Sequence, residues 1–331
     1  MAAPAWRASA EAGYAAALAR AYGGQADPGA ALARLAAAAE AAQARADRLL
    51  RALGLRDGPV AERFARLSAD PVSLYADTSE GRDRAVAYMN ARLAALRPRL
   101  LVAFGDLPIA PAQVRRMSPA DEAAGRGGYR VPPGDGQPGV YYADLHAVRA
   151  RPAWTLPSVA FHEVTPGHLL QMPLEAAAHP APARAKAAGA FFEAWAIYAE
   201  ELSAELGAYR RDARGEVGYL HWRLFRLARG MADIGLHTLG WSGEEAISRV
   251  AALQGFPAAF VGIPADVARI AANPGKVAAE ALGALDLTDW RPKDRAKWPA
   301  YHRMLLTEAP WPFGELEERL FTGGLGRGGE P

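Results

Sequence analysis

Most of this chain is built from strong helix formers that carry apolar residues at helical spacing. Residues 29–53 read GAALARLAAAAEAAQARADRLLRAL, in which Leu35, Leu49 and Leu53 contribute to the apolar face of a predicted helix that ends at Gly54. Further helices are predicted at about residues 79–96, 156–172, 184–207, 215–239, 243–254 and 277–284 and near the C-terminus. Strands and helices do not alternate in the order typical of a parallel sheet, so we expect a mainly α fold.

Residues 105–140 depart from this helical pattern. They include GRGGYRVPPGDGQPG, whose many glycines and prolines favour irregular backbone. A short strand is predicted at the end of this segment, at residues 139–142. We therefore expect one small β element within the helical fold.

The composition limits the partners and compartments that this chain is expected to have. Its 38 basic and 36 acidic residues leave a formal charge of +2, which gives no reason to expect nucleic acid or an anionic membrane as a partner. Cysteine is absent, so disulfides, thiolate metal ligands and a cysteine nucleophile are excluded. We find neither a signal-peptide core nor an apolar run of ~20 residues, and the expected localisation is cytoplasmic.

The segment FHEVTPGH, residues 161–168, places two histidines around a glutamate. The zinc-protease pattern HExxH sets its histidines four residues apart on one helix face. His162 and His168 are six residues apart and would differ by ~120° in an unbroken helix. Proline is excluded from a regular helix interior, and glycine adopts conformations closed to other residues. We therefore expect Pro166 and Gly167 to interrupt the helix and to bring His168 beside His162.

A third metal ligand is available in FFEAWAIYAEE, residues 191–201. Glu193 is flanked by Phe192 and Trp195, so its carboxylate is expected to be partly buried and to need a partner. Catalytic zinc sites use three protein ligands and a water molecule, and two histidines with a glutamate are a common set. His162, His168 and Glu193 are thus the predicted zinc ligands. The alternative for Glu193 is an ordinary glutamate on a helix surface.

Four polar residues form a line along the predicted helix at 215–239. Within WRLFRLARGMADIGLH, intervals of three and four residues separate Arg226, Arg229, Asp233 and His237. An ion pair between Arg229 and Asp233 would explain two of them. We interpret the full line as supporting or substrate-binding residues, and we expect His237 to donate a hydrogen bond to a developing oxyanion.

Three ordered motifs in these segments resemble those of a bacterial family, domain of unknown function 885 (DUF885), which is grouped with zincin-like metallopeptidases. The family pattern HExxPGHxxQ is matched by His162, Glu163, Pro166, Gly167, His168 and Gln171. The pattern EGWAxYxE is matched by Glu193, Trp195, Ala196, Tyr198 and Glu200, with Ala194 in place of glycine. The pattern RxxRxxxDxGLHxxGW is matched by Arg226, Arg229, Asp233, Gly235, Leu236, His237, Gly240 and Trp241.

This resemblance covers most of the chain and implies both a fold and a site. It implies a mainly helical, zincin-like (gluzincin-related) fold, zinc on the three ligands above, and Glu163 as the general base. The segment that ends in GVYY also resembles the family, and there we expect Tyr141 and Tyr142 to contact the substrate. The expected organisation is an N-terminal helical region at 1–96 and a metal-binding catalytic region at 97–322, which together form one compact unit, with a disordered tail at 323–331.

One position departs from the family pattern PGxxxxYxxG. This chain reads NPGKVAAEALG, so Glu280 stands where the family has a tyrosine. A phenol can donate a hydrogen bond to an oxyanion, whereas an ionised carboxylate cannot. Glu280 is therefore expected to be a protonated carboxyl near the metal, an additional base or a contact for a cationic substrate. The alternative is a surface position at which the residue type has no role.

Three functions stay open. We favour a zinc hydrolase that cleaves an amide or peptide-like bond of a small-molecule or peptide-like substrate, with a metal-activated water and Glu163 as base. Glu280 favours an alternative, a zinc-dependent lyase, isomerase or cyclase of a biosynthetic pathway in which Glu163 and Glu280 act as acid and base. The third hypothesis is a metal-free binding protein that keeps the fold.

Overall fold

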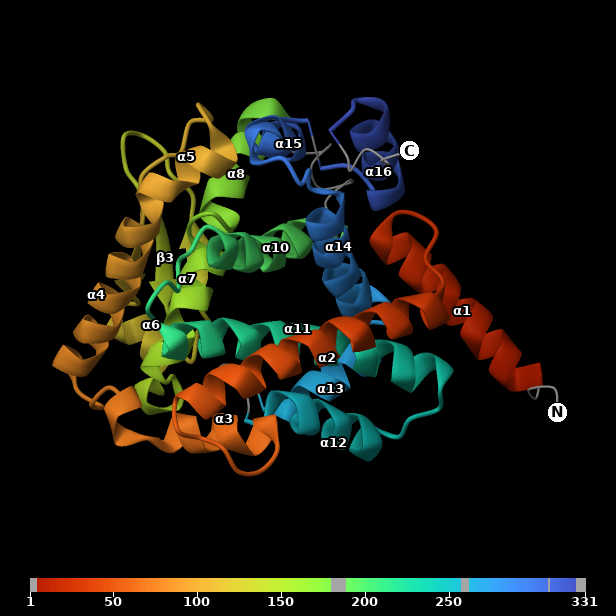
Figure 1. Cartoon of the computed structure of the whole chain (residues 1–331), viewed down its shortest axis with the longest axis horizontal. Helices are drawn as coiled ribbons and strands as arrows, with labels where there is room; N and C mark the ends of the chain where they lie inside the picture. Colours follow the sequence, from red (N-terminus) through yellow and green to blue (C-terminus); the bar gives the residue numbers. More distant parts are fainter. Residues whose placement is uncertain (1–4, 180–188, 257–261, 309, 326–331) are drawn as a thin grey trace.

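The computed structural model describes residues 5–179, 189–256, 262–308 and 310–325, and it confirms the mainly helical fold (Figure 1). The helices before the sheet are α1 (Ala5–Tyr22), α2 (Pro28–Ala52), α3 (Val60–Ala69), α4 (Ser79–Leu96) and α5 (Leu100–Phe104). The helices after the sheet are α7 (Leu156–Glu163), α8 (His168–Ala178), α10 (Phe191–Glu205), α11 (Ala213–Thr238), α12 (Gly243–Gln254), α13 (Ile263–Ala271), α14 (Lys276–Trp290), α15 (Trp298–Thr307) and α16 (Phe313–Thr322).

Four of the predicted helices agree closely with the structure. The segments expected at 79–96, 215–239 and 243–254 correspond to α4, α11 and α12, and the run at 29–53 corresponds to α2. The helix expected at 184–207 is α10; its expected start, within residues 180–188, and most of the expected tail, residues 326–331, lie outside the described residues.

A small sheet corrects the expectation for residues 105–140, which is not irregular throughout. The sheet has the order β1-β3-β2 and consists of β1 (Ala112–Arg116), β2 (Tyr129–Val131) and β3 (Gly139–Ala143), with the short helix α6 (Pro119–Ala123) between β1 and β2. β3 pairs parallel with β1 and antiparallel with β2. The outer edge of β1 is paired by a side chain of α4, since the Asn90 amide bonds both the N–H and the carbonyl of Val114 at 2.9 Å. Because this contact joins two separate segments of the chain, the local sequence did not indicate β1, and this strand was not predicted.

The N-terminal helices cover α11 and α14. α2 packs along α11, and α1 contacts both α11 and α14 (Figure 1). One close approach is at Gly230 of α11, where a Cβ atom would lie 3.0 Å from Cδ1 of Leu35 and 3.3 Å from Cβ of Ala281. The absence of a side chain at Gly230 therefore sets the spacing of α2, α11 and α14.

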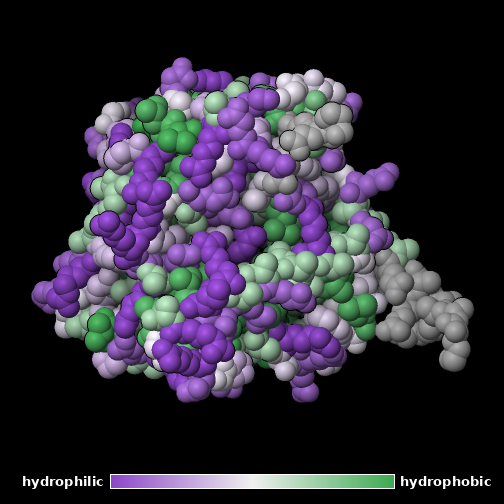
Figure 2. Space-filling view, viewed as in Figure 1, coloured by the Kyte–Doolittle hydropathy of each residue, from purple (hydrophilic) through white to green (hydrophobic). Residues whose placement is uncertain are grey.

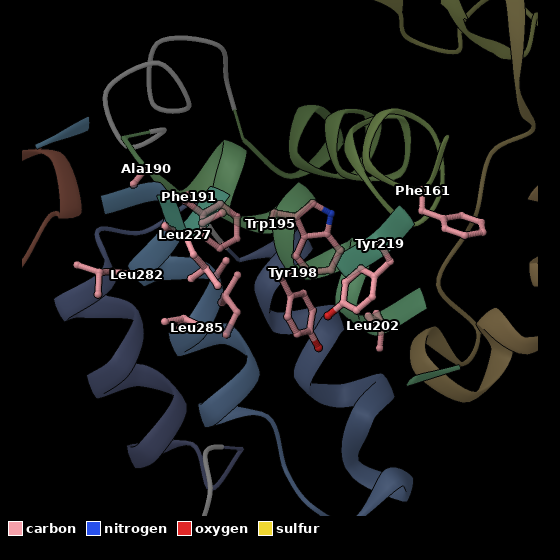
Figure 3. Packing of buried hydrophobic residues seen from close by; sticks show 14 of the residues in the cluster. Phe161, Ala190, Phe191, Trp195, Tyr198, Leu202, Tyr219, Leu227, Leu282 and Leu285 are labelled. Atoms are coloured by element: carbon pink, nitrogen blue, oxygen red, sulfur yellow. The ribbon is translucent and has the colours of Figure 1, made fainter. Parts of the chain in front are cut away.

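α10 runs through the main hydrophobic core. Figure 3 shows Phe191, Trp195, Tyr198 and Leu202 of α10 in this core, and the exposed fraction of each is 0% or 1%. The outer face seen in Figure 2 is mostly hydrophilic, with hydrophobic residues in small separate groups. Because α10 is anchored by its buried aromatic side chains, it is a rigid support for the polar residues that it carries.

Candidate metal centre

The turn between α7 and α8 brings the two histidines together, as the sequence predicted. A Cβ atom on Gly167 would lie only 1.8 Å from the carbonyl oxygen of His162, so the turn has room for glycine alone. Trp195 of α10 donates a hydrogen bond from Nε1 to the carbonyl oxygen of Pro166 at 3.0 Å. The helix therefore stops and restarts, and the ring centroids of His162 and His168 lie 5.0 Å apart.

His162, His168 and Glu193 form a cluster that fits a metal ion. Nε2 of His162 lies 3.6 Å from Oε2 of Glu193, and Nε2 of His168 lies 3.5 Å from Oε1. Ligand atoms at ~2.1 Å from a tetrahedral zinc ion are about 3.4 Å apart, which agrees with these distances. Nε2 of His168 is also buried and has no hydrogen-bond partner in the described part of the chain, as expected of a nitrogen that serves as a metal ligand.

Each histidine is oriented through its other ring nitrogen. Nδ1 of His162 lies 2.9 Å from Oε1 of Glu200, and Nδ1 of His168 lies 3.3 Å from Oε1 of Gln171. These contacts place the N–H on Nδ1 and leave Nε2 of both rings facing Glu193. Carboxylate and amide partners of this kind are typical of metal-ligating histidines, because they fix the tautomer and the ring orientation.

Sequence analysis assigned no role to Glu200 or Gln171, although both match the family motifs. Glu200 follows Glu193 by seven residues, which is about two helical turns and therefore the same face of α10. A second carboxylate at this spacing from a ligand is the signal that could have identified it. Gln171 follows His168 by three residues and is its neighbour on α8 for the same reason.

The protonation of the cluster follows from burial and hydrogen bonding. Burial and the nearby Arg226 oppose a positive charge on His162, but hydrogen bonds with Glu193 and Glu200 outweigh them and raise the pKa of His162 to about 9. Burial lowers the pKa of His168. Burial acts to raise the pKa of Glu193, but the two histidines hold it well below its usual range. In the absence of an ion, a proton on His162 thus balances the Glu193 charge, and a bound cation would displace this proton.

The candidate base, Glu163, lies next to the cluster on the wall of a cleft. Its side chain is 18% exposed and forms an ion pair of 2.5 Å with Arg130 of β2. The Arg130 guanidinium also lies over the Phe192 ring, 5.6 Å from the centroid. The contact of Arg130 with Glu163 was not predicted from the sequence, because β2 comes close to α7 through its pairing with β3.

The cleft beside the metal cluster has two lobes, of about 340 and 410 Å³. Both lobes are lined by Gly128, His162, Glu163, Arg226 and Arg269. The smaller one, which we call the aromatic lobe, is lined in addition by Gly127, Tyr141, Asp144, Arg151, Val159, Glu200 and Trp222. The larger one, which we call the cationic lobe, is lined in addition by Arg130, Glu193, Arg229, Ile270, Asn273, Lys276, Val277 and Glu280. A substrate held at His162 and Glu163 would extend into both lobes.

The two tyrosines that the sequence predicted as substrate contacts lie on opposite faces of β3. Tyr141 lines the aromatic lobe, whereas the Tyr142 ring stacks on Tyr129 with centroids 4.8 Å apart. This difference follows from the alternation of side chains along a strand. Burial and the charge of Glu163 raise the pKa of Tyr141, which keeps its phenol a hydrogen-bond donor. The structure therefore brings Tyr141 to the site and leaves Tyr142 outside the lining of both lobes.

The predicted polar line along α11 divides into a half that faces the cleft and a structural half. Arg226 and Arg229 line the cleft. Asp233 is fully buried and accepts hydrogen bonds from two backbone N–H groups at the start of α14, at 3.0 and 3.2 Å. The ring nitrogens of His237 lie 2.8 and 3.2 Å from backbone carbonyl oxygens. Because His237 is eleven residues beyond Arg226, or ~16 Å along the helix, the structure does not bring it to the oxyanion position expected from the sequence.

Glu280 lies in the wall of the cationic lobe. Its exposed fraction is 7%, and it makes no hydrogen bond or ion pair with the other residues that the structure describes. Burial, and next the charge of Glu193, raise the pKa of Glu280 to about 7. Position 280 is therefore buried and not a surface position, while a role for its carboxylate stays a prediction.

Comparisons with known proteins identify a family and solved structures that this chain resembles. The sequence model of a family described as bacterial protein of unknown function (DUF885) matches residues 1–320. A solved structure from Colwellia psychrerythraea, described as that of a lipoprotein, matches with a TM-score of 0.84 and 25% identity over 95% of this chain and 55% of that chain. A protein of unknown function from Shewanella oneidensis, also described as a lipoprotein, matches with a TM-score of 0.73 and 16% identity over 95% of this chain and 59% of that chain. This chain thus spans less than two thirds of the length of either relative.

No curated protein matches this sequence. Across the residues that the structure describes, we find no helix that combines the length and the apolar character needed to cross a bilayer. The cytoplasmic localisation stays a prediction, as do the expected absence of nucleic-acid and membrane partners and the small-molecule or peptide-like nature of the substrate.

Proposed function

Because this chain belongs to the bacterial DUF885 family, whose function is unknown, its function has to be inferred from its own site, and we propose that it is a zinc-dependent hydrolase of an amide or peptide-like bond. One observation supports this proposal most directly: His162, His168 and Glu193 converge beside Glu163. Two histidines and a glutamate next to a carboxylate base are a common catalytic zinc arrangement. The zincin-like fold implied by the motifs is part of the same proposal.

The residues around the cluster supply the parts that hydrolysis needs. A bound zinc ion would acidify a water molecule and polarise the substrate carbonyl. Glu163 would accept the proton of the attacking water and pass it to the leaving nitrogen. Arg130 holds one oxygen of Glu163 and leaves the other available to the water. Arg226, which lines both lobes together with Glu163, would donate to the developing oxyanion in place of His237.

The test combines metal analysis with a substitution of the base. The purified protein is expected to contain about one zinc ion per chain and to hydrolyse short blocked peptides, with products detected by mass spectrometry. Glu163→Gln should keep the fold and the zinc but lower turnover by roughly 10²–10⁴-fold. Protein that contains no metal after zinc-supplemented purification would remove the proposal, and so would unchanged turnover in Glu163→Gln.

A second candidate function rests on Glu280. A buried carboxylate in the same lobe as Glu193, with no hydrogen bond or ion pair to any described residue, is not required for hydrolysis, and its raised pKa suits proton exchange near neutral pH. The alternative is thus a zinc-dependent lyase, isomerase or cyclase in which Glu163 and Glu280 act as acid and base. Product masses discriminate, because hydrolysis adds one water to the substrate, whereas isomerisation leaves its mass unchanged and a lyase splits it without adding water.

A further inference from the structure

We propose that the cationic lobe contains a carboxylate-binding subsite formed by Arg269 and Lys276, with Arg229 behind them, and that the substrate therefore carries a free carboxylate. In a peptide-like substrate this group is the C-terminal carboxylate. The inference rests on the proposed function only in assuming that the cleft binds the substrate. It holds for hydrolysis and equally for the alternative chemistry.

A single buried carboxylate orients two arginines at this lobe. Asp266 has an exposed fraction of 3% and bonds Arg229 twice, from Nε at 2.9 Å and from NH2 at 3.3 Å. The same Asp266 accepts a hydrogen bond from NH2 of Arg269 at 3.2 Å. One negative charge thus holds two guanidinium groups beside the cleft. Arg269 keeps further N–H donors, and its fixed planar fork matches a carboxylate.

The charges that line the lobe leave a small positive surplus. Five cationic side chains line it, namely those of Arg130, Arg226, Arg229, Arg269 and Lys276. Three carboxylates line it, namely those of Glu163, Glu193 and Glu280. Asp266 beneath them adds a fourth carboxylate, so these side chains leave a surplus of one positive charge, and the proton on His162 adds a second in the metal-free protein. The lobe is therefore cationic, which suits an anionic group, and the planar guanidinium of Arg269 suits a carboxylate.

Not all of the cationic side chains in this lobe are engaged in ion pairs with the described residues. Lys276 forms no ion pair with the described residues, and the Arg269 side chain is 58% exposed at the rim shared by the two lobes. A carboxylate at this rim would lie in the same cavity as Glu163, while the remainder of the substrate would reach Tyr141 and Trp222 in the aromatic lobe. Lobes of this volume suit a small ligand such as a short peptide.

Binding, measured without turnover, tests the subsite. Zinc-loaded Glu163→Gln protein is titrated calorimetrically with N-acetyl-dialanine and with its C-terminal amide, and the titrations are repeated on metal-free protein. The acid is expected to bind about tenfold more tightly than the amide, which corresponds to about 1.4 kcal/mol. Adding Arg269→Gln should remove most of this preference. Arg249→Gln is the matched control, because Arg249 is 55% exposed and pairs with Glu245 on α12, outside both lobes.

Each outcome supports or overturns the subsite. Equal affinity for acid and amide overturns it. A preference that persists in both Arg269→Gln and Lys276→Gln also overturns it, because the carboxylate then binds elsewhere, for example on the metal. Inorganic phosphate that binds more tightly than acetate and depends on Arg269 overturns the assignment to a carboxylate. An intact acid preference in a protein that hydrolyses no peptide supports the subsite and refutes only the hydrolase.

Discussion

Replacing Glu200 with glutamine is expected to weaken zinc binding without disturbing the fold. Glu200 has an exposed fraction of 3% and accepts hydrogen bonds from Nδ1 of His162 at 2.9 Å and from Oγ of Ser158 at 2.5 Å. Glutamine has the same size and can still accept with its amide oxygen, but it carries no charge. Both hydrogen bonds then lose their charge-assisted character, and the ligand nitrogen of His162 becomes less basic.

The expected magnitude follows from these two contacts. A hydrogen bond to a charged group contributes about 1.5–3 kcal/mol, against about 1 kcal/mol for a neutral one. The change should therefore cost about 1–3 kcal/mol of zinc-binding free energy, or roughly a five- to hundredfold increase in Kd. Zinc Kd values are measured by competition with a chromogenic chelator.

The adjacent residue provides the control. Glu201 bonds Arg223 and Thr288 and does not line the cleft, so Glu201→Gln should leave the zinc Kd unchanged. An unchanged Kd in Glu200→Gln would refute the orienting role of Glu200. Equal weakening in both variants would show that the effect comes from general destabilisation of α10.

Three further outcomes are expected. Gly167→Ala should lose zinc and lower the melting temperature, because its Cβ would collide with the His162 carbonyl, and full zinc content on elemental analysis would contradict this. Glu280→Tyr should keep or improve hydrolysis of simple peptides; its loss with zinc retained would favour the lyase, isomerase or cyclase. Burial lowers the pKa of His302 from 6.5 to about 3, so the folded protein binds fewer protons than the unfolded chain and loses stability as the pH falls below 6.5. The free energy of unfolding, measured by urea denaturation, should therefore depend less steeply on pH in His302→Gln than in the wild type, by up to about 1.4 kcal/mol per pH unit. Equal slopes in the two proteins would contradict this.

The features predicted correctly from the sequence are those that local chemistry decides. α2 and α11 carry long runs of helix formers with apolar periodicity, and their packing agrees with that pattern. The interruption after α7 was predictable because Pro166 and Gly167 cannot continue a regular helix. The cluster of His162, His168 and Glu193 was predictable because few residue types bind zinc and a local break was available to align them.

The features that the sequence did not reveal depend on contacts between distant segments. β1 is fixed by Asn90, and Arg130 reaches Glu163 only through the pairing of β2 with β3. The spacing of the polar residues along α11 predicts which of them share a helix face. It does not predict how far along the helix the cleft extends. Asp233 and His237 fall beyond that end, and Asp233 caps α14 instead.

The close approach at Gly230 connects the packing of α11 against α14 with the width of the cationic lobe. Arg229 directly precedes Gly230, and Glu280 directly precedes Ala281, so this contact sets how far apart two walls of the cationic lobe stand. A methyl group at position 230 would lie 3.3 Å from Cβ of Ala281, so we expect a small shift of α14 away from α11 while every lining side chain stays the same. We therefore expect position 230 to affect the fit of a ligand in the lobe without lining it. A shift of Gly230→Ala toward longer peptides, with zinc content unchanged, is the expected result, and an unchanged length preference would contradict it.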